Sequence, residues 1–253
     1  KIYEKYELTD VIHFAAESHV DNSIKNPSIF METNVLWTLN LLLLHKEFDM
    51  NRFHYVSTDQ VYGELSDDPN DKFKEITSIK PNSPYSVSKT SWDLLTLAYH
   101  RTFDVDATVS RCSNNYWPNQ DKEKLIPHFI WLLTNNQKVT LYGDGKNIRD
   151  WLYVEDHCDA IWTIFKDWKS GGIYNVWGNT EKTNLEITNE ILDGVWLNED
   201  WISFVKDRPW HDRRYAIDAS KIKQELWREP KYNFRDWIKS TINFYKSYFN
   251  SIK

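Results

Sequence analysis

The length, composition and charge of the chain exclude several classes of protein. Of its 253 residues, 41% are hydrophobic and 27% are charged, as in a globular protein with one large domain, or one domain and a small lobe. The 37 acidic residues outnumber the 31 basic ones, for a net charge of -6, which gives nucleic-acid binding no electrostatic support. The longest mostly apolar stretch, 35–44, is too short to span a bilayer.

The cysteine content indicates neither a disulfide framework nor a metal site. Cys112 and Cys158 are the two cysteines of the chain, and they lack the spacing of metal ligands. The first ten residues are polar and do not resemble a signal peptide. We therefore expect a cytoplasmic protein that binds no metal and no membrane.

Strand-like and helix-like segments alternate in the first half of the chain. The expected strands are 11–16, 52–57 and 106–112, and the expected helices are 26–48, 84–102 and 125–135. Pro27 and Pro84 suit the first turn of a helix. This alternation predicts an α/β fold with a doubly wound parallel sheet, covered by helices on both faces.

Beyond about residue 116 the alternation loosens. Short strands are expected at 139–142, 151–154, 173–176, 202–205 and 214–217, and helices at 155–168, 188–192, 219–226 and 234–249. We expect these segments to form a smaller C-terminal α/β lobe, which shares the later part of the chain with the main sheet.

The glycine-rich turn that binds phosphate in doubly wound domains is missing from the sequence. Neither G-x-x-G-x-x-G nor G-x-G-x-x-G occurs, and the pair Gly143 and Gly145 lies far downstream without a third glycine. Either the fold is different, or the first βαβ unit is absent from this chain.

The strongest local signal is a tyrosine and a lysine four residues apart, Tyr85 and Lys89, on one face of the helix expected at 84–102. A phenol with a pKa of about 10 is a poor base at neutral pH, and an adjacent ammonium favours its ionised form. Such a pair takes a proton from a sugar hydroxyl while hydride leaves the same carbon. Taken alone, however, an incidental pair on a solvated helix explains the spacing better.

Further motifs agree with the catalytic interpretation of this pair. They occur, in this order, at 14–20, 33–35, 57–63, 83–89, 111–116, 123–127, 142–157 and 211–218. Together they closely resemble the dTDP-glucose 4,6-dehydratases, a family of extended short-chain dehydrogenases/reductases. The stretches A-A-E-S-H-V-D, N-N-Y and R-D-W-L-Y-V-E-D-H are far more specific than the tyrosine and lysine. The resemblance covers the chain from about residue 11.

The resemblance implies an NAD cofactor and a nucleotide-sugar substrate, dTDP-glucose or a related one. A Rossmann-like domain, N-terminally incomplete and made of 1–116 with part of 139–178, would hold NAD, and 117–253 would mainly hold the sugar nucleotide. By position, the NAD side would be lined by Phe14, Ala15, Ala16, Glu17, Ser18, Thr33, Tyr85, Lys89 and Asn115. The substrate side would be lined by Ser18, Thr58, Asn114, Lys124, Leu125, Tyr142, Arg149, Asn184, Arg208 and His211.

The cationic members of the substrate set, Lys124, Arg149 and Arg208, suit a diphosphate. Each of them taken alone is better explained as solvated surface charge.

The resemblance also assigns a mechanism, in which Thr58, Asp59, Gln60, Tyr85 and Lys89 are the catalytic positions. Tyr85 deprotonates the carbon-4 hydroxyl as hydride passes to NAD. Asp59 then protonates the leaving hydroxyl of carbon 6, and its neighbour removes the proton from carbon 5. Two carboxyls in opposite protonation states would serve this division of roles. The product, dTDP-4-keto-6-deoxyglucose, belongs to deoxysugar biosynthesis such as that of rhamnose.

The sequence departs from the family at the position of the base. Residue 60 is Gln60, where the family has glutamate, and an amide cannot accept the proton. In addition, tryptophan stands at positions where the family has glycine: Trp37, Trp117, Trp177, Trp210 and Trp227. The counts agree with this exchange, since the chain has 7 glycines and 13 tryptophans in 253 residues, whereas roughly 7% glycine is usual.

Three functions therefore stay open at this point. The first is an NAD-dependent lyase acting on dTDP-glucose, and the second is a related dehydratase, epimerase or decarboxylase acting on another nucleotide sugar. Asp59 argues against a plain epimerase, which protonates no leaving hydroxyl. The third is a catalytically silent protein that binds a nucleotide sugar, which Gln60 and the tryptophans favour.

By analogy with the family we also expect a homodimer, in which the helices at 27–48 and 84–102 pair with their copies. Apolar residues available for that face are Leu94, Leu95, Leu97 and Ala98. The same residues would equally serve to pack the helix against the sheet of its own chain.

Overall fold

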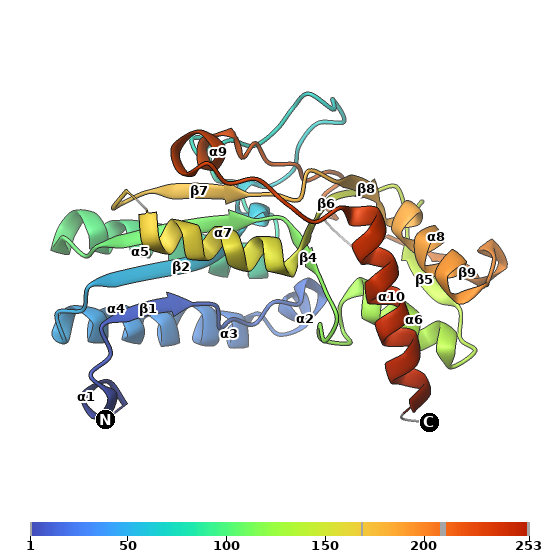
Figure 1. Cartoon of the computed structure of the whole chain (residues 1–253), viewed down its shortest axis with the longest axis horizontal. Coiled ribbons are helices and arrows are strands. Elements are labelled where there is room, and N and C mark those ends of the chain that lie inside the picture. The colour runs from blue at the N-terminus through green and yellow to red at the C-terminus, as the bar shows by residue number, and fades with distance from the viewer. Residues whose placement is uncertain (1, 168, 208–210, 252–253) are drawn as a thin grey trace.

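A four-stranded parallel sheet forms the centre of the larger half of the protein (Figure 1). The computed structural model describes residues 2–167, 169–207 and 211–251. The strand order is β1-β2-β3-β7, and each neighbouring pair runs parallel. The strands are β1 (Asp10–His13), β2 (Arg52–Thr58), β3 (Ala107–Cys112) and β7 (Ile173–Val176). The predicted α/β fold with a parallel sheet is confirmed.

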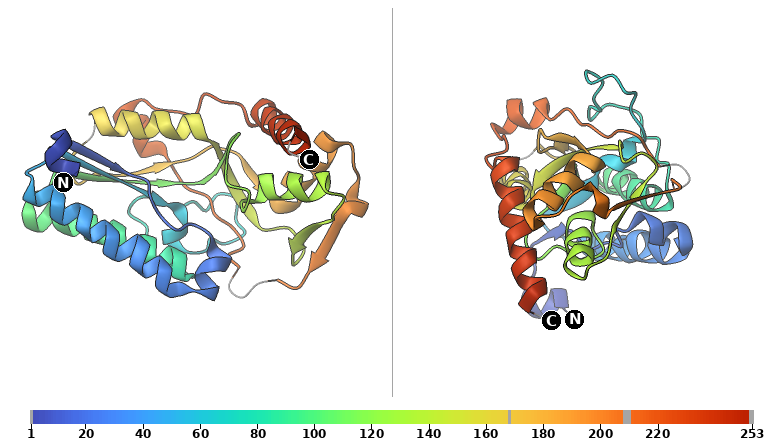
Figure 2. Two further views of the ribbon diagram at one scale, coloured as in Figure 1. Left: turned by 90° about the horizontal axis from the view of Figure 1, so that it is seen from below. Right: turned by 90° about the vertical axis from the view of Figure 1, so that its right-hand side faces the viewer.

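Helices cover both faces of this sheet. α5 (Pro84–Phe103) and a long helical segment at 27–47 lie side by side on one face, and α7 (Val154–Asp167) lies on the other (Figure 2). Buried apolar side chains, among them Phe53, Trp92 and Val109, fill the space between the sheet and α5. This packing of apolar strands and helix faces agrees with the alternating pattern in the sequence.

The long helical segment differs from the single helix expected at 26–48. It consists of α3 (Pro27–Phe30), a π-helix (Met31–Trp37) and α4 (Thr38–Glu47). The length of the segment is predicted correctly, whereas the π-helix has no signature in the apolar spacing. Such π-helical turns are rare in proteins, and those that occur are often found at functional sites.

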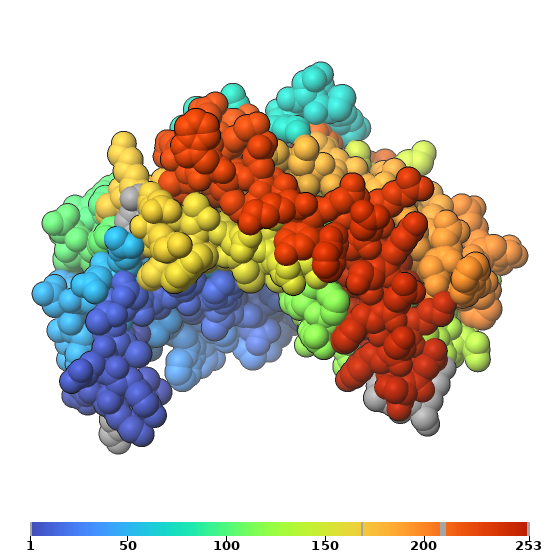
Figure 3. All heavy atoms as spheres, in the orientation of Figure 1, coloured from blue at the N-terminus to red at the C-terminus, as the bar shows by residue number. Residues whose placement is uncertain are grey.

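The later part of the chain forms a second core beside the main sheet. Its strands are β4 (Asn114–Tyr116), β6 (Ile148–Tyr153) and β8 (Glu181–Thr183) in one sheet, and β5 (Val139–Tyr142) and β9 (Ile202–Val205) in another. Its helices are α6 (Leu125–Thr134), α8 (Asn184–Val195) and α10 (Phe234–Ser251). Ile130, Ile191 and Ile238 are fully buried among them. In the space-filling view the molecule is hollowed along its lower edge, between the N-terminal segment and α10 (Figure 3).

Five short helical elements complete the described structure. They are α1 (Ile2–Tyr6), α2 (Val20–Lys25), a 3-10 turn at Asp59–Tyr62, a 3-10 turn at Glu199–Trp201 and α9 (Ser220–Leu226). The sequence predicts neither of the first two helices, nor β8. It predicts α8 only from residue 188, whereas a capping box between Thr183 and Glu186 starts that helix earlier. Among the described residues, no helix is both long and apolar enough to cross a membrane.

Two strand predictions require correction. β1 ends at His13 rather than at residue 16, because the next residues turn away from the sheet. The strand expected at 214–217 is wrong, since Arg214 and Ile217 form only isolated bridges. Arg214 is buried, and its guanidinium donates to backbone carbonyls of the loop around residues 66–71, including that of Asp68 at 2.7 Å. The segment therefore runs along a loop instead of a neighbouring strand.

Two tryptophans end helices in the left-handed backbone conformation. Trp196 comes after α8 with a φ of 65°, and Trp227 comes after α9 with a φ of 54°. Glycine is the usual residue at this position, because a side chain strains the backbone there. The two side chains are 86% and 89% exposed, so burial of the indoles offsets little of that strain. At Trp227 the backbone therefore has the conformation of a glycine, the residue that the resemblance implies there.

The other tryptophans at glycine positions have different surroundings. Trp37 is 64% exposed on the surface of the segment at 27–47. Trp117 packs against the second core, and Trp177 packs between two apolar clusters, so the chain has accommodated both indoles. Trp210 lies outside the described residues.

The left-handed conformation leads to a stability prediction. Trp227→Gly and Trp196→Gly should each raise the free energy of unfolding by about 1 kcal/mol, because glycine removes the strain. Trp162→Gly is the matched control: Trp162 is 52% exposed within α7, where glycine should lower the free energy of unfolding by about 1 kcal/mol. Urea unfolding measures all three. A loss of stability in the first two variants would contradict the interpretation.

Candidate active site

The predicted catalytic residues gather at the carboxyl ends of the parallel strands. β2 ends at Thr58, and Asp59 and Gln60 come directly after it in the 3-10 turn. Tyr85 and Lys89 lie in the first two turns of α5, which packs on β2 and β3. Ligands of open α/β sheets bind at this edge.

Local sequence determines where α5 begins. Ser83 is its N-cap, and the hydroxyl of Ser83 accepts a hydrogen bond from the backbone N–H of Ser86 at 3.1 Å. The hydroxyl of Ser86 in turn accepts a bond from the N–H of Ser83 at 2.9 Å, and Pro84 occupies the first helical position. This capping box fixes the end of the helix next to which Tyr85 stands.

Tyr85 and Lys89 are both buried. The ring of Tyr85 stands edge-on to Phe30, with 6.3 Å between the centroids. The ammonium of Lys89 donates a hydrogen bond to the carbonyl of Val56 at 2.8 Å and lies 4.4 Å from the ring centre of Tyr55. The lysine is thus held against β2.

Burial shifts the pKa of both groups toward the neutral form. Desolvation raises the pKa of Tyr85 above its usual range, although a hydrogen bond with Thr58 acts in the opposite direction. Desolvation also lowers the pKa of Lys89 to about 8, and the charge of Asp93 opposes this shift. The sequence predicts a lowered pKa for Tyr85, but in the structure burial and the neighbouring groups Cys112 and Asp59 raise it, and the hydrogen bond with Thr58 does not offset them.

Asp59 is the group whose surroundings match its expected role most closely. It is 1% exposed, and desolvation raises its pKa to about 7, although the nearby Arg149 lowers it. The hydroxyl of Thr58 donates to its Oδ1 at 3.1 Å. Its Oδ2 is buried and has no hydrogen-bond partner among the described residues. A carboxyl of this kind keeps a proton near neutral pH and is able to donate it.

Gln60 stands beside this acid but does not complete an acid–base pair. Its side chain is partly buried, and its backbone N–H donates to the hydroxyl of Thr58 at 3.3 Å. An amide cannot take up a proton as a carboxylate does. The turn therefore presents one proton donor and no base at position 60.

The residues assigned to the NAD side come after β1. Phe14 is 53% exposed, Ala15 is exposed, and Ala16 is partly buried. Glu17 exchanges two backbone hydrogen bonds with the side chain of Asn34, at 2.8 and 2.9 Å. The same amide donates to the hydroxyl of Ser88 on α5 at 2.9 Å.

Asn34 therefore ties the loop after β1 to α5, and the sequence did not indicate this role. It lies inside the π-helix, next to Thr33, which is partly buried. An asparagine in an apolar helical run, next to a predicted ligand-binding threonine, is the signal that would have indicated a buried hydrogen-bonding role.

The last residue assigned to NAD, Asn115, lies on β4. Its amide donates to the carbonyl of Ser113 at 3.0 Å, and its Oδ1 is 2.9 Å from Nδ1 of His157. In the neighbouring Asn114, Oδ1 is buried and without a partner among the described residues. Unsatisfied buried atoms such as this one and Oδ2 of Asp59 fit a site that a polar ligand completes.

Two residues assigned to the substrate form a contact between the two halves. The ammonium of Lys124 donates to the carbonyl of Ser18 at 3.0 Å and to its hydroxyl at 2.9 Å. Leu125 comes next as the first residue of α6 and is partly buried.

Three further residues assigned to the substrate, Tyr142, Asn184 and His211, lie on the second lobe. Tyr142, at the end of β5, stands edge-on to His211 with 6.1 Å between the ring centroids. His211 forms a hydrogen bond of 2.7 Å with Asp207. Asn184 is the first residue of α8, and Arg208 lies outside the described residues.

Arg149 differs from the exposed cation expected from its sequence context. It is 6% exposed, and it donates to the carbonyls of Ile148 and Asp212 at 2.7 and 2.8 Å. Its guanidinium lies 4.3 Å from the ring centre of Tyr215. Through its charge it favours the ionised form of Asp59. The structure thus brings together Arg149 and the catalytic turn.

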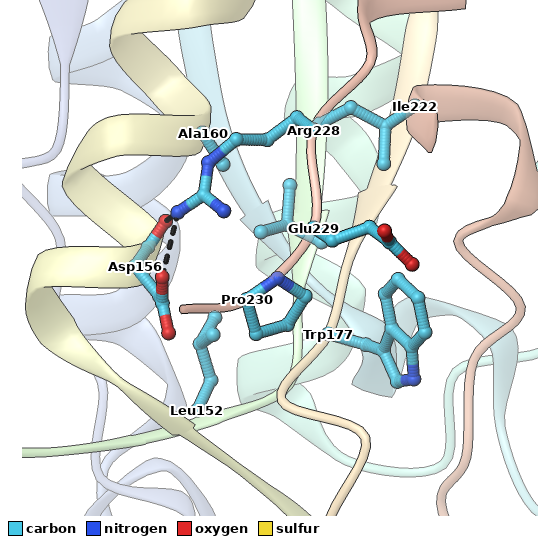
Figure 4. A pocket seen from close by; sticks show the side chains of 9 residues that line it. Leu152, Asp156, Ala160, Trp177, Ile222, Arg228, Glu229 and Pro230 are labelled. Atoms are coloured by element: carbon cyan, nitrogen blue, oxygen red, sulfur yellow. Dashed lines mark hydrogen bonds and ion pairs between the residues drawn. The ribbon is translucent and has the colours of Figure 1, made fainter. Parts of the chain in front are cut away.

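A crevice elsewhere in the molecule is too small to bind a nucleotide sugar. It lies between α7, β7 and the segment after α9, and Arg228 and Trp177 are among its lining residues (Figure 4). Its volume of about 10 Å³ suffices for one water molecule. Within the described ranges, no three histidine, cysteine or acidic side chains come together as a metal site.

Comparison with known proteins identifies relatives across nearly the whole chain. The sequence profile of the GDP-mannose 4,6 dehydratase family matches residues 1–241. The dTDP-glucose 4,6-dehydratase of Xanthomonas campestris pv. campestris (strain ATCC 33913) is 44% identical over 263 residues, which cover 97% of this chain and 74% of that protein.

Solved structures agree with this comparison. The dTDP-glucose 4,6-dehydratase DesIV from Streptomyces venezuelae, with NAD and TYD bound, superimposes with a TM-score of 0.93 at 40% identity, over 96% of this chain and 75% of that one. The UDP-glucose 4-epimerase of Thermus thermophilus, in complex with NAD, gives a TM-score of 0.90 at 25% identity, over 97% and 80% of the two chains. Dehydratases and epimerases thus share this fold.

The raised pKa of Asp59 leads to a pH-dependent stability prediction. Its folded pKa of about 7 lies above the ordinary value of 3.8, so the folded state binds the proton more tightly than the unfolded state. The stabilisation from Asp59 is therefore present at low pH and is lost as the pH rises from about 4 to 7. In Asp59→Asn the side chain does not titrate, so this loss of stability with rising pH is abolished. Relative to the native chain, the variant should gain about 3 kcal/mol between pH 5 and pH 8.

Urea unfolding of both proteins at the two pH values measures the difference. An equal difference in the free energy of unfolding at pH 5 and pH 8 would mean that Asp59 is already ionised in the folded protein.

Proposed function

Because the chain belongs to the dTDP-glucose 4,6-dehydratases, within the broader GDP-mannose 4,6 dehydratase family, we propose that it is an NAD-dependent lyase that forms dTDP-4-keto-6-deoxyglucose from dTDP-glucose. The observation that carries this proposal is Asp59, a buried carboxyl with a pKa of about 7 and a free Oδ2, at the carboxyl end of β2. An elimination of water needs such a proton donor, whereas an epimerisation does not.

The first step uses residues of α5 and the end of β2. Tyr85 takes the proton of the carbon-4 hydroxyl, and the hydroxyl of Thr58 hydrogen-bonds to Tyr85. Lys89, held by the carbonyl of Val56, supplies positive charge near the phenolate as it forms. NAD, when bound, would supply the hydride chemistry that the reaction needs at carbons 4 and 6. The residues proposed to hold it are Phe14, Ala15, Ala16, Glu17, Ser18, Thr33, Tyr85, Lys89 and Asn115.

The elimination step uses the turn after β2. Asp59 donates its proton to the hydroxyl leaving carbon 6, and Thr58 orients the carboxyl through the bond to Oδ1. Gln60 occupies the position of the base that removes the carbon-5 proton. Because the amide accepts no proton in that role, we expect this step to limit the rate.

Substrate binding is proposed for the surface between the two halves. Lys124 and Ser18, already in contact, would meet the nucleotide sugar together with the other substrate-side positions, namely Thr58, Asn114, Leu125, Tyr142, Arg149, Asn184, Arg208 and His211. The proposed division assigns 1–116 with part of 139–178 to the NAD-binding domain and 117–253 mainly to the substrate lobe. The separate apolar cores of the two halves support it. We further propose a cytoplasmic protein that serves deoxysugar biosynthesis, such as that of rhamnose.

Dimerisation is proposed through the exposed faces of α5 and the segment at 27–47. Leu94 on α5 is 55% exposed, and Leu36 and Leu43 on the neighbouring segment are 57% and 48% exposed. Side-by-side apolar side chains of this kind favour a protein partner. Of the residues expected at the interface, Leu94 and Ala98 are exposed, whereas Leu97 is buried in the core of its own chain.

Gln60 favours a second candidate, a protein that binds a nucleotide sugar without completing the reaction. The two candidates differ only in the steps after the oxidation of carbon 4, so one substitution separates them.

Gln60→Glu should raise the formation of 4-keto-6-deoxy product about 10²–10⁴-fold, because a positioned base typically contributes that much to the rate. The native chain, mixed with NAD and dTDP-glucose, should give slow absorbance of reduced nicotinamide and little product. The alkali-induced absorbance of the 4-keto sugar measures turnover, and Tyr85→Phe is the inactive control. No product from either protein, with the nucleotide sugar still bound, would support the silent binding protein.

Leu94→Glu should convert the expected dimer into a monomer, because two buried carboxylates would face each other at the interface. Ile76→Glu is the matched control, since Ile76 is 91% exposed on the loop before α5 and should leave the dimer intact. Light scattering measures the mass of each protein. A native chain that is monomeric at micromolar concentration would refute the proposed dimer.

A further inference from the structure

A network of buried polar side chains connects α5 to the turn that carries Asp59. Asp93 on α5 accepts a hydrogen bond from Nε of Arg111 at 2.6 Å. Nη1 of Arg111 donates to the hydroxyl of Tyr62 at 2.8 Å, and that hydroxyl donates to Oδ1 of Asn175 at 2.8 Å. None of these four side chains is more than 2% exposed. The network thus joins α5, β3, the 3-10 turn and β7.

Two members of the network lie within four residues of proposed catalytic residues along the chain. Asp93 is four residues after Lys89 on α5, so the two side chains share one face of the helix. Tyr62 is three residues after Asp59 in the 3-10 turn, where residues three apart lie directly above one another. The network therefore connects the two segments that carry proposed catalytic residues, α5 and the 3-10 turn.

Tyr62 has little freedom to move. The guanidinium of Arg111 lies 4.8 Å from the centre of its ring, and the ring stacks on Phe73 with 5.0 Å between the centroids. Asn175 is itself fixed, since its amide donates to the carbonyls of Phe73 and Asp218, each at 3.0 Å. A buried charge such as Arg111 is costly unless its partners stay in place, so each member of the network constrains the others.

We propose that Tyr62 is a positioning residue, which holds the turn of Asp59 and Gln60 against α5 through Arg111 and Asp93. It keeps the groups that transfer protons in the two successive steps at a fixed separation. The effect of Tyr62 on catalysis rests on the proposed function, whereas its effect on the position of the turn does not.

Tyr62→Phe tests the positioning directly, because it keeps the ring and deletes the hydroxyl with its two hydrogen bonds. A loosened turn admits water to Asp59, so the pKa of that carboxyl should fall by about one unit or more toward its ordinary value. The titration is monitored by NMR of the carboxyl carbon of Asp59. The charged groups that face Asp59, Arg149 and Asp150 on β6, stay unchanged.

Tyr174→Phe is the matched control. Tyr174 is fully buried on β7, and its hydroxyl hydrogen-bonds to Glu225 at 3.2 Å, outside the network. This variant should lose comparable stability and leave the titration of Asp59 where it is. The proposal is overturned if Tyr62→Phe leaves the titration unmoved, or if both variants shift it equally. If Tyr62→Phe does not fold, Arg111→Lys, which keeps a charge beside Asp93, carries the same expectation.

Kinetics add a second readout in the Gln60→Glu chain. There Tyr62→Phe should slow elimination about tenfold and leave the oxidation of carbon 4 unchanged, because only the turn is displaced. Equal slowing of both steps would overturn the positioning role. If the Gln60→Glu chain oxidises no dTDP-glucose at all, the proposed function fails, and the titration of Asp59 still decides whether Tyr62 positions the turn.

Discussion

The ion pair of Arg111 and Asp93 is fully buried between β3 and α5, and the arrangement of the candidate active site depends on it. Removing two charges from water costs several kcal/mol per ion and is offset only when the pair keeps its geometry. A shift of α5 along the sheet would separate the charges, so the pair fixes the helix at one position on β3. That helix carries Tyr85 and Lys89, whose place relative to the end of β2 is therefore fixed as well.

Desolvation acts on three of the groups proposed as catalytic and favours the neutral form of each. It raises the pKa of Asp59 to about 7, lowers that of Lys89 to about 8 and raises that of Tyr85. For Asp59 the neutral form is the proton donor that an elimination needs. For Tyr85 the neutral form is the wrong form for a base. The phenol would lose its proton more readily if further positive charge lay close to it.

The tryptophans of the chain have different structural consequences in different places. Trp117 and Trp177 are packed against apolar clusters, where the indole contributes buried surface. Trp196 and Trp227 stand almost fully exposed in a left-handed conformation, where a side chain strains the backbone. The helix ends at both places keep the geometry that glycine allows, and the N–H of each tryptophan donates to a carbonyl of its own helix, that of Asp193 or Lys223.

The sequence by itself determined the elements whose apolar pattern is local, such as α5, α6, β3 and β5, and its motifs indicated which residues to expect at the active site. It did not determine what those residues do in their surroundings. Tyr62 and Asn175 are 113 positions apart, and Arg214 serves a loop rather than the strand that its neighbours suggest. Burial and hydrogen bonding between distant segments determine these contacts, and they also determine the protonation of Asp59. Only the tertiary structure brings those segments together. The periodicity of a sequence indicates which face of one helix or strand is buried, but it does not indicate which other element packs against that face.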